Sequence, residues 1–585
     1  MMNILLLRKY VWKFLRILEI SLCSILICAL LAMVGACSSL LSLPTSGGIS
    51  QIPRKARQDR LIYSNPPGPQ KNAEPEDIVR GFLDALPSGL QRGSFSVAHE
   101  FLSSTVRHSW KPRASSTIYT GDLGVQREAR NLDGTGASQL ITVAISVSIV
   151  GRVGLDGTYQ PVQQHKKEIL TFKLTKAKSQ WRIASLDNGV LISRQDFDQV
   201  FRQVTLYQPS RSCEAFIPDV RWFGRHDWKR YALSQLLSSP PKWLDRVVRN
   251  IVEYKVSLVS VSGDNSAVRV TVSSNFAVLP RDVQALVVRM IKLTISGHDD
   301  DSSVSVYAGE NDFTHADKNV KYTSSSASQS VYSVSSRHLL SLALTSAIRV
   351  GEIPIDVSQP SFTYSNHKAV IIDGNHRAQC IDSDGSACGV LFDGQQVSYV
   401  TAGMGLQVWA VSADGRSVMV AQNEQRTYQR IQLNLPAQYV IRSIAVSPEG
   451  ERMVVVLSQG ASAQTVLYGI VRNDKKEVAG LSDSNLTLSY KSNISMASFY
   501  NDTIVVYATN PDGSGVQRAY RQSMPGLEIA QSLPEVPVIA IAAGQISSSQ
   551  KLAVLCVDRT VRGIGGSLTG GWQIMDTQAV ALSQR

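Results

Sequence analysis

The chain has 585 residues, of which 43% are hydrophobic, and a formal net charge of +12 at neutral pH. This length exceeds what one hydrophobic core supports, so about three domains are expected, and the hydrophobic fraction excludes wholesale disorder. The basic residues are dispersed and form no Lys/Arg stripe interleaved with aromatic residues, which argues against nucleic-acid binding. Dispersed positive charge is suited instead to a protein beside anionic lipid or cell-wall polymers.

The first 36 residues have the pattern of a targeting segment. Four basic residues between positions 8 and 16 precede a mostly apolar stretch over 17–34, and the small residues Gly35 and Ala36 follow it. A charged start, an apolar core and small residues before a cleavage point are typical of a secretory signal peptide. The next residue is Cys37, and the Val-Gly-Ala-Cys run resembles the signal of bacterial lipoproteins.

That resemblance implies that residues 1–36 are removed and that Cys37 is attached to membrane lipid through acyl chains such as palmitate. A second interpretation is an uncleaved membrane helix that begins near Leu15, because the apolar stretch is close to the length of a span. Basic residues before the stretch keep its N-terminal end in the cytoplasm in both cases. Both interpretations place the folded part on the extracytoplasmic face of the cell membrane.

Residues 37–73 are expected to form a tether, because Ser, Gly and Pro are frequent there. Residues 74–200 are expected to form a first α+β domain, which begins with a helix at Pro75-Glu76-Asp77. Strand patterns then follow over residues 140–149, 168–174 and 180–184. Helices followed by a meander resemble an NTF2-like domain, in which a helix packs on a curved sheet.

Residues 201–310 are expected to form a second α+β domain. A β-hairpin around Gly263-Asp264-Asn265 and a helix over 281–293 are its main features. Their order resembles the GerMN domain, an extracytoplasmic module without an assigned catalytic residue. Residues 311–334 are expected to form a linker.

Residues 335–585 are predicted to form an all-β propeller. Short β runs alternate with Asp-Gly or Glu-Gly turns, and the stretches 408–420 and 443–455 are alike at an offset of 35 residues. Repeated β units of this size are typical of propeller blades. The length allows five or six blades, with an N-terminal strand as a candidate for closing the ring. An irregular β-sandwich is the alternative. The fold class is therefore multidomain, α+β followed by all-β.

The cysteines outside the targeting segment and Cys37 include a candidate pair. Cys380 and Cys388 flank Asp-Ser-Asp-Gly, which can turn the chain back and bring the two thiols together. Free structural thiols are the alternative. No Cys-x-x-Cys spacing occurs, so neither a metal site nor a cofactor is predicted. The sequence also lacks a Gly-x-Ser-x-Gly elbow, a Walker loop and a His-Glu-x-x-His helix, so a protein that is not an enzyme, without catalytic residues, is expected.

The order of these parts resembles the LpqB lipoprotein family of actinobacteria over essentially the whole chain. The residues that carry the resemblance are 75–83, 110–112, Leu206-Tyr207, 217–222 and the Ser-Pro-Glu-Gly turn at Ser447. It implies an accessory lipoprotein of the MtrA–MtrB two-component system. In that role the protein binds the extracytoplasmic domain of the sensor histidine kinase and modulates envelope and cell-division signalling. The alternative function is non-catalytic binding of cell-wall glycan.

Overall fold

The computed structural model describes residues 66–584 except for 129–139, 164–166, 265–266, 298–302, 319, 321–329, 343–346, 423–426, 547–548 and 565–570. Residues 63–585 form one compact unit. The expected signal segment, Cys37 and most of the expected tether lie outside the described residues. Within the described part of the chain, no helix is both long and apolar enough to cross a membrane.

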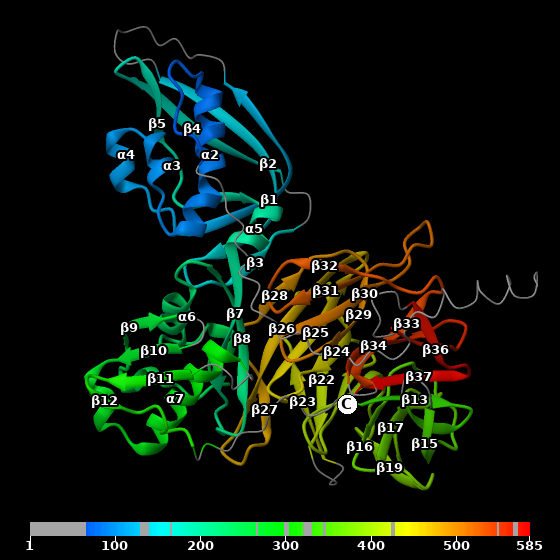
Figure 1. Ribbon diagram of the computed structural model, residues 1–585. Coiled ribbons are helices and arrows are strands. Elements are labelled where there is room, and N and C mark those ends of the chain that lie inside the picture. Colours follow the sequence, from blue (N-terminus) through cyan, green and yellow to red (C-terminus); the bar gives the residue numbers. More distant parts are fainter. Residues whose placement is uncertain are drawn as a thin grey trace, which may run out of the picture. The chain divides into compact units, whose positions relative to one another are not determined.

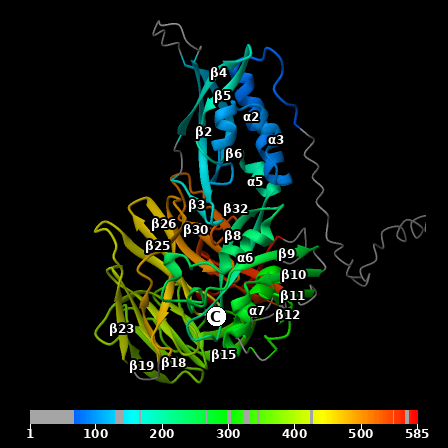
Figure 2. The same ribbon diagram turned by 90° about the vertical axis from the view of Figure 1, so that its left-hand side faces the viewer.

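The first part of this unit is a helix packed on a six-stranded sheet (Figures 1 and 2). Helix α2 (Pro75–Arg92) begins with Pro75 at its first turn and ends before Gly93, whose φ of 76° lies in the left-handed region that favours glycine. Its apolar face, including Ile78 and Phe82, packs against the sheet. The strand order is β5-β4-β2-β1-β6, with β3 paired to β2.

The other elements of this part are α3 (Ser96–Glu100), α4 (Ser104–Ser109), β1 (Ser115–Arg127), β2 (Leu140–Gly154), β3 (Tyr159–Pro161), β4 (Lys167–Ala177), β5 (Gln180–Ser185), β6 (Val190–Ser193) and α5 (Arg194–Val200). Strand β2 alternates buried and half-buried residues along almost its whole length. This alternation is what a strand with one face on a core requires, and it agrees with the strand pattern expected from the sequence.

The second part begins with the antiparallel pair β7 (Phe201–Pro209) and β8 (Phe216–Gly224). Its four-stranded sheet has the order β12-β11-β10-β9, and α7 connects the parallel strands β10 and β11. Helix α7 packs against β7 and β11.

The elements of the second part after β8 are α6 (Trp228–Leu236), η2 (Lys242–Leu244), η3 (Val252–Tyr254), β9 (Leu258–Gly263), β10 (Ala267–Val272), η4 (Ser274–Val278), α7 (Arg281–Ser296), β11 (Ser303–Ala308) and β12 (Asn311–Asp312). The segment expected as a linker, 311–334, is partly inside the sheets: β12 pairs with β11, and the first propeller strand begins at Val331.

The third part consists of six sheets of the propeller kind. Five have four strands, and the sheet that begins with β24 has a fifth strand, β28. Its strands are β13 (Val331–Ser335), β14 (His338–Leu342), β15 (Ala347–Glu352), β16 (Thr363–Ser365), β17 (Lys368–Ile372), β18 (Ala378–Asp382), β19 (Ala387–Leu391), β20 (Val397–Ala402), β21 (Val408–Ser412), β22 (Ser417–Ala421), β23 (Tyr428–Gln432), β24 (Val440–Val446), β25 (Arg452–Gln459), β26 (Ser462–Arg472), β27 (Val478–Leu481), β28 (Leu486–Ser489), β29 (Ile494–Phe499), β30 (Ile504–Thr509), β31 (Ala519–Ser523), β32 (Glu528–Gln531), β33 (Val538–Ile546), β34 (Ser549–Cys556), β35 (Val561–Ile564), β36 (Trp572–Asp576) and β37 (Ala579–Gln584). The expected fold class, α+β followed by all-β, is confirmed.

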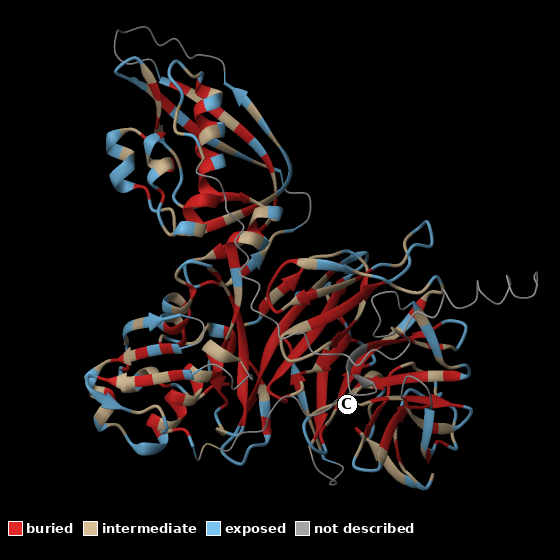
Figure 3. Ribbon diagram, in the orientation of Figure 1, coloured by how far each residue is buried: buried red, intermediate tan, exposed pale blue. Residues whose placement is uncertain are grey.

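Ring closure differs from the expectation of an N-terminal closing strand. The C-terminal strand β37 pairs with β13 and becomes the innermost strand of the first blade, with Leu582 opposite Ser333. The start of the propeller contributes three strands to this blade, β13, β14 and β15, and β37 is its fourth strand, on the inner side of β13. Its buried side chains Ala579 and Leu582 join the core between the first and last blades, so closure also buries apolar surface (Figure 3).

The two similar stretches of sequence occupy different places in their blades. Residues 408–420 span the second and third strands of one blade, β21 and β22, whereas 443–455 span the first and second strands of the next, β24 and β25. Both stretches form the same serine-initiated hairpin turn, in which Ser412 or Ser447 accepts the bond from a glycine N–H. The likeness therefore reflects a shared hairpin and not a shared blade position.

The closing strand can be tested by a matched pair of truncations. Leu582→Ala removes a buried side chain from the closing strand and is expected to cost about 3 kcal/mol of unfolding free energy. Ile574→Ala, on the exposed face of β36, is expected to cost about 0.5 kcal/mol or less. Urea unfolding of both variants measures the difference, and equal costs would show that β37 does not close the ring.

Candidate functional site

The predicted lipidation site, Cys37, lies outside the described residues. Cys380 and Cys388 form a disulfide in the structure, between the neighbouring strands β18 and β19, with their Cα atoms 5.1 Å apart. The turn between them is the expected one, because Gly385 donates its N–H to the Asp382 carbonyl. The other two described cysteines, Cys213 and Cys556, are not in disulfides.

Buried charge is concentrated where β8 meets the propeller. In the part of the chain that the structure describes, no group of three or more His, Cys, Asp or Glu side chains is placed to hold a metal ion. Three of the five buried acidic groups in the described residues are paired with arginines at this junction, whereas Asp317 and Asp373 pair with basic residues elsewhere. The junction pairs involve residues 217–222 and the turn at Ser447, two of the segments that carried the family resemblance.

Arg452 is the centre of this junction. Its side chain is fully buried, as is that of its partner Glu449, to which it donates from Nε at 2.5 Å and from Nη2 at 3.1 Å. The remaining donors reach backbone carbonyls: Nη1 donates to Pro218 O at 3.1 Å and Nη2 to Asp502 O at 2.5 Å. One guanidinium thus connects β8 with the turns of two adjacent blades. A buried charge needs this degree of pairing, since removing it from water is costly.

The turn that presents the pair is built from local hydrogen bonds. Ser447 donates from Oγ to Glu449 at 2.6 Å and accepts from the Arg452 N–H at 3.0 Å. Gly450 takes a φ of 77°, the left-handed conformation that this tight turn requires. The Ser-Pro-Glu-Gly turn therefore holds the Glu449 carboxylate next to Arg452, which is the first residue of β25.

Strand β8 is also joined to the first α+β part. Arg221 donates to both carboxylate oxygens of Asp219, at 2.9 and 2.7 Å, and to the carbonyl and carboxylate of Asp156 at 2.9 and 3.0 Å. Burial opposes ionisation of Asp156, but hydrogen bonds from Thr158 and the charge of Arg221 leave its pKa lowered. The Arg221–Asp219 pair is nearly inaccessible to water. Strand β8 is therefore joined to the propeller by the carbonyl of Pro218 and to the first α+β part by the side chain of Arg221.

Apolar side chains also pack between β8 and the propeller. Ile217 is fully buried between two blades, in a core shared with Trp243 and Val247. Gly469 of β26 lies so close that a Cβ there would be 2.9 Å from the Trp243 carbonyl, so this position needs glycine for close approach. The propeller residues of this core include Ala445, Val454, Val456, Leu467, Phe499, Val505 and Tyr507.

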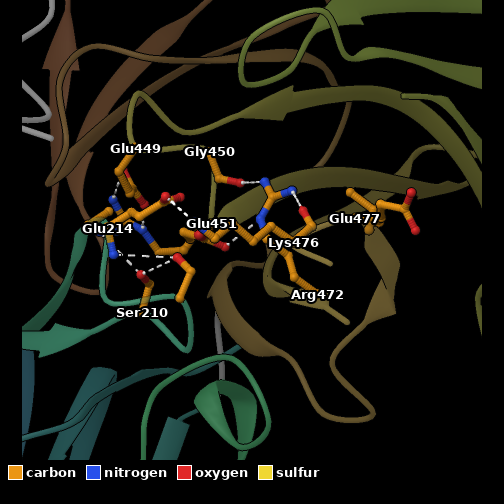
Figure 4. Close-up of polar contacts among 12 residues, drawn as sticks. Ser210, Glu214, Glu449, Gly450, Glu451, Arg472, Lys476 and Glu477 are labelled. Carbon is orange, nitrogen blue, oxygen red and sulfur yellow. Dashed lines mark hydrogen bonds and ion pairs between the residues drawn. The ribbon is translucent and has the colours of Figure 1, made fainter. Parts of the chain in front are cut away.

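A second buried pair extends the junction (Figure 4). Arg472 donates from Nε to Glu451 at 3.0 Å, and both side chains are 4% exposed. Burial raises the pKa of the Glu451 carboxyl to about 7, opposed by Arg472 and reinforced by Glu449 and Glu214. Close by, Lys476 pairs with Glu214, which lies between β7 and β8. Arg472 is thus the main group that opposes this rise.

The junction is suited to holding parts of the protein together. Glu449, Glu451 and Asp219 are each ion-paired with an arginine. Sequence reasoning noticed residues 217–222 and the Ser447 turn but missed Arg452 and Arg472. For Arg452, the available signal was an arginine at the start of an otherwise apolar strand, with Glu449 in the preceding turn. Arg472 and Glu451 are 21 residues apart, so their pairing leaves no local signal.

Fold and junction define a multidomain protein in which an α+β region is fixed to a six-bladed β-propeller. Residues 68–198 match the family model described as lipoprotein LpqB, N-terminal domain, and residues 349–553 match the lipoprotein LpqB beta-propeller domain. The chain is 35% identical to lipoprotein LpqB of Bifidobacterium longum over 552 residues, which are 94% of this chain and 96% of that one. The chain therefore belongs to the LpqB family of lipoproteins.

A second relative matches over a shorter range. Lipoprotein LpqB of Cutibacterium acnes is 27% identical over 287 residues, 48% of this chain and 46% of that one. Among solved structures, a chain of a nidogen/laminin complex aligns with a TM-score of 0.33 at 10% identity, over 44% of this chain and 98% of that chain. A likeness this low bears on neither fold nor function.

The buried pair can be tested against an exposed pair of the same spacing. Arg452→Met is expected to cost about 3–5 kcal/mol of unfolding free energy, because it leaves Glu449 buried and uncompensated. Replacing both partners, Glu449→Leu with Arg452→Met, is expected to recover most of that loss. The control is Arg349→Met, whose partner Glu352 is half exposed, with an expected cost of about 0–1 kcal/mol. Equal costs for the two single variants, measured by urea unfolding, would contradict the assigned role of Arg452.

The disulfide can be tested by reduction. A bridge that closes a loop of this size is expected to stabilise the protein by about 2–3 kcal/mol, so a reductant should lower the melting temperature. The double variant Cys380→Ser/Cys388→Ser should already show the lower value and be insensitive to reductant, whereas Cys213→Ser should still respond. Peptide mass spectrometry without reduction identifies the linked pair directly. If no peptide linked through Cys380 and Cys388 is found, the disulfide is contradicted.

Proposed function

We propose that this protein is a lipid-anchored, extracytoplasmic accessory protein that binds a sensor histidine kinase of the MtrB type and modulates its signalling without catalysing a reaction. The similarity to a lipoprotein over 94% of the chain carries the proposal. The Val-Gly-Ala-Cys run before residue 38 supports anchoring through acylated Cys37. Two acyl chains on one cysteine are enough for stable membrane attachment.

The junction supports a binding role over an enzymatic one. Residues 63–585 form one compact unit, and the buried acids at its centre are consumed in ion pairs. A unit of this kind presents fixed loop surfaces to a partner, which limits the ordering cost of binding. The kinase as partner follows from the family resemblance to accessory lipoproteins of the MtrA–MtrB system. The modulated output would be envelope and cell-division signalling.

Photo-crosslinking in intact cells tests this proposal. The wild-type protein is expected to capture the sensor kinase, and deletion of the protein is expected to change the phosphorylated fraction of the response regulator. Cys37→Ser removes the sulfur that accepts the lipid, so it is expected to shift the protein out of the membrane fraction and to reduce capture.

A control separates anchoring from recognition. A variant whose residues 1–37 are replaced by an uncleaved transmembrane helix should recover both membrane attachment and kinase capture. Absence of the kinase from the captured proteins, together with unchanged response-regulator phosphorylation on deletion, would overturn the proposed partner. An unmodified Cys37 in the mature protein would overturn the proposed anchor.

A further inference from the structure

The innermost strands of the propeller surround a cavity of about 410 Å³. These strands are β16, β20, β24, β29, β33 and β37, and each contacts the next around the ring. Every blade contributes to the wall through its innermost strand or the residues beside it: Ser361, Val400, Ile444, Ala497, Ile541 and Leu582. The volume is in the range of pockets that hold small molecules.

The wall of the cavity combines apolar side chains, such as Val400 and Ile444, with polar groups of the strand edges. Each innermost strand is an edge strand of its sheet, so it is paired with a neighbouring strand on one side only. Its unpaired edge faces the cavity. Such an edge presents N–H and C=O groups that need hydrogen-bond partners. Side chains satisfy some of them: Ser361 Oγ accepts from Val400 N at 3.3 Å, and Gln584 donates to Phe499 O at 2.8 Å. The wall therefore offers hydrogen-bond donors and acceptors beside apolar side chains.

Among the residues that the structure describes, the wall offers no free charge to an ionic ligand. Apart from tyrosines, Glu449 is the one ionisable residue among those that line the cavity, and its carboxylate is committed to Arg452. Burial raises the pKa of Tyr399 to about 12, so its hydroxyl stays neutral. A phosphate or a carboxylate would lose its hydration here without gaining an opposite charge. A ligand with several hydroxyl groups would match both donors and acceptors.

We propose that this central cavity is a binding site for a neutral polyhydroxylated ligand, a saccharide unit. The proposal gives the glycan alternative a definite location, and it is independent of kinase binding. Water alone would also satisfy the strand edges, so a cavity that holds only water is the competing outcome.

The mature full-length protein in lipid nanodiscs, free of sugar-based detergent, is the sample for the test. Saturation-transfer NMR with D-glucose and N-acetyl-D-glucosamine is expected to show binding, and glucose 6-phosphate is expected to bind at least about tenfold more weakly, a difference of about 1.4 kcal/mol. Ala402→Trp fills the rim of the cavity and should abolish the neutral-sugar signal. Ala437→Trp, on an exposed turn outside the cavity, should leave it unchanged.

Three results would overturn the proposal. The first is that neither neutral sugar binds at concentrations up to about 10 mM, which exceeds weak millimolar dissociation constants. The second is that glucose 6-phosphate binds as tightly as glucose, and the third is that Ala402→Trp binds the neutral sugars as tightly as the wild type. Circular dichroism checks that each variant is folded. If Ala402→Trp is not, Thr401→Val removes one hydroxyl from the wall at nearly constant volume and should weaken binding severalfold. Kinase capture by Ala402→Trp should be unchanged, so a failure here is distinguishable from a failure of the proposed function.

Discussion

A buried guanidinium is stable only when charge and hydrogen bonds surround it, and Arg452 meets that requirement with groups from three places. Its carboxylate partner Glu449 belongs to its own turn, one carbonyl comes from the next blade, and another comes from Pro218 of β8. Moving β8 away would leave a buried donor without its acceptor, which costs more than an ordinary hydrogen bond contributes. This constraint makes the α+β region and the propeller parts of one structure.

The same constraint shapes what the protein can do. Strand β8 contacts the first α+β part through Arg221 and the propeller through Pro218 and Ile217, so one strand is joined to both. Strand β3 of the first part also contacts β28 of the propeller directly. Such a connection holds the loops of the propeller at a fixed place relative to the α+β region. Of the described residues that line the central cavity of the propeller, by contrast, Glu449 is the one that belongs to these ion pairs.

Local patterns predicted much of this fold, and contacts between distant segments account for what they missed. Helix α2 follows from Pro75 with two acids behind it, and the strand at 140–149 follows from alternation. Closure by β37 was missed because pairing between β13 and β37 joins the two ends of the propeller and leaves no local signal. Arg452 was missed because two of its acceptors are backbone carbonyls, Pro218 O and Asp502 O, which any residue could supply.

Amide hydrogen exchange of the mature protein tests the union of β8 with the propeller most directly. If Arg452 joins them, peptides covering Phe216–Gly224 and Arg452–Gln459 should open with the same free energy in the wild type. In Arg452→Met, the β8 peptide should lose protection first. Independent, weakly protected exchange of β8 in the wild type, unaffected by Arg452→Met, would contradict the account.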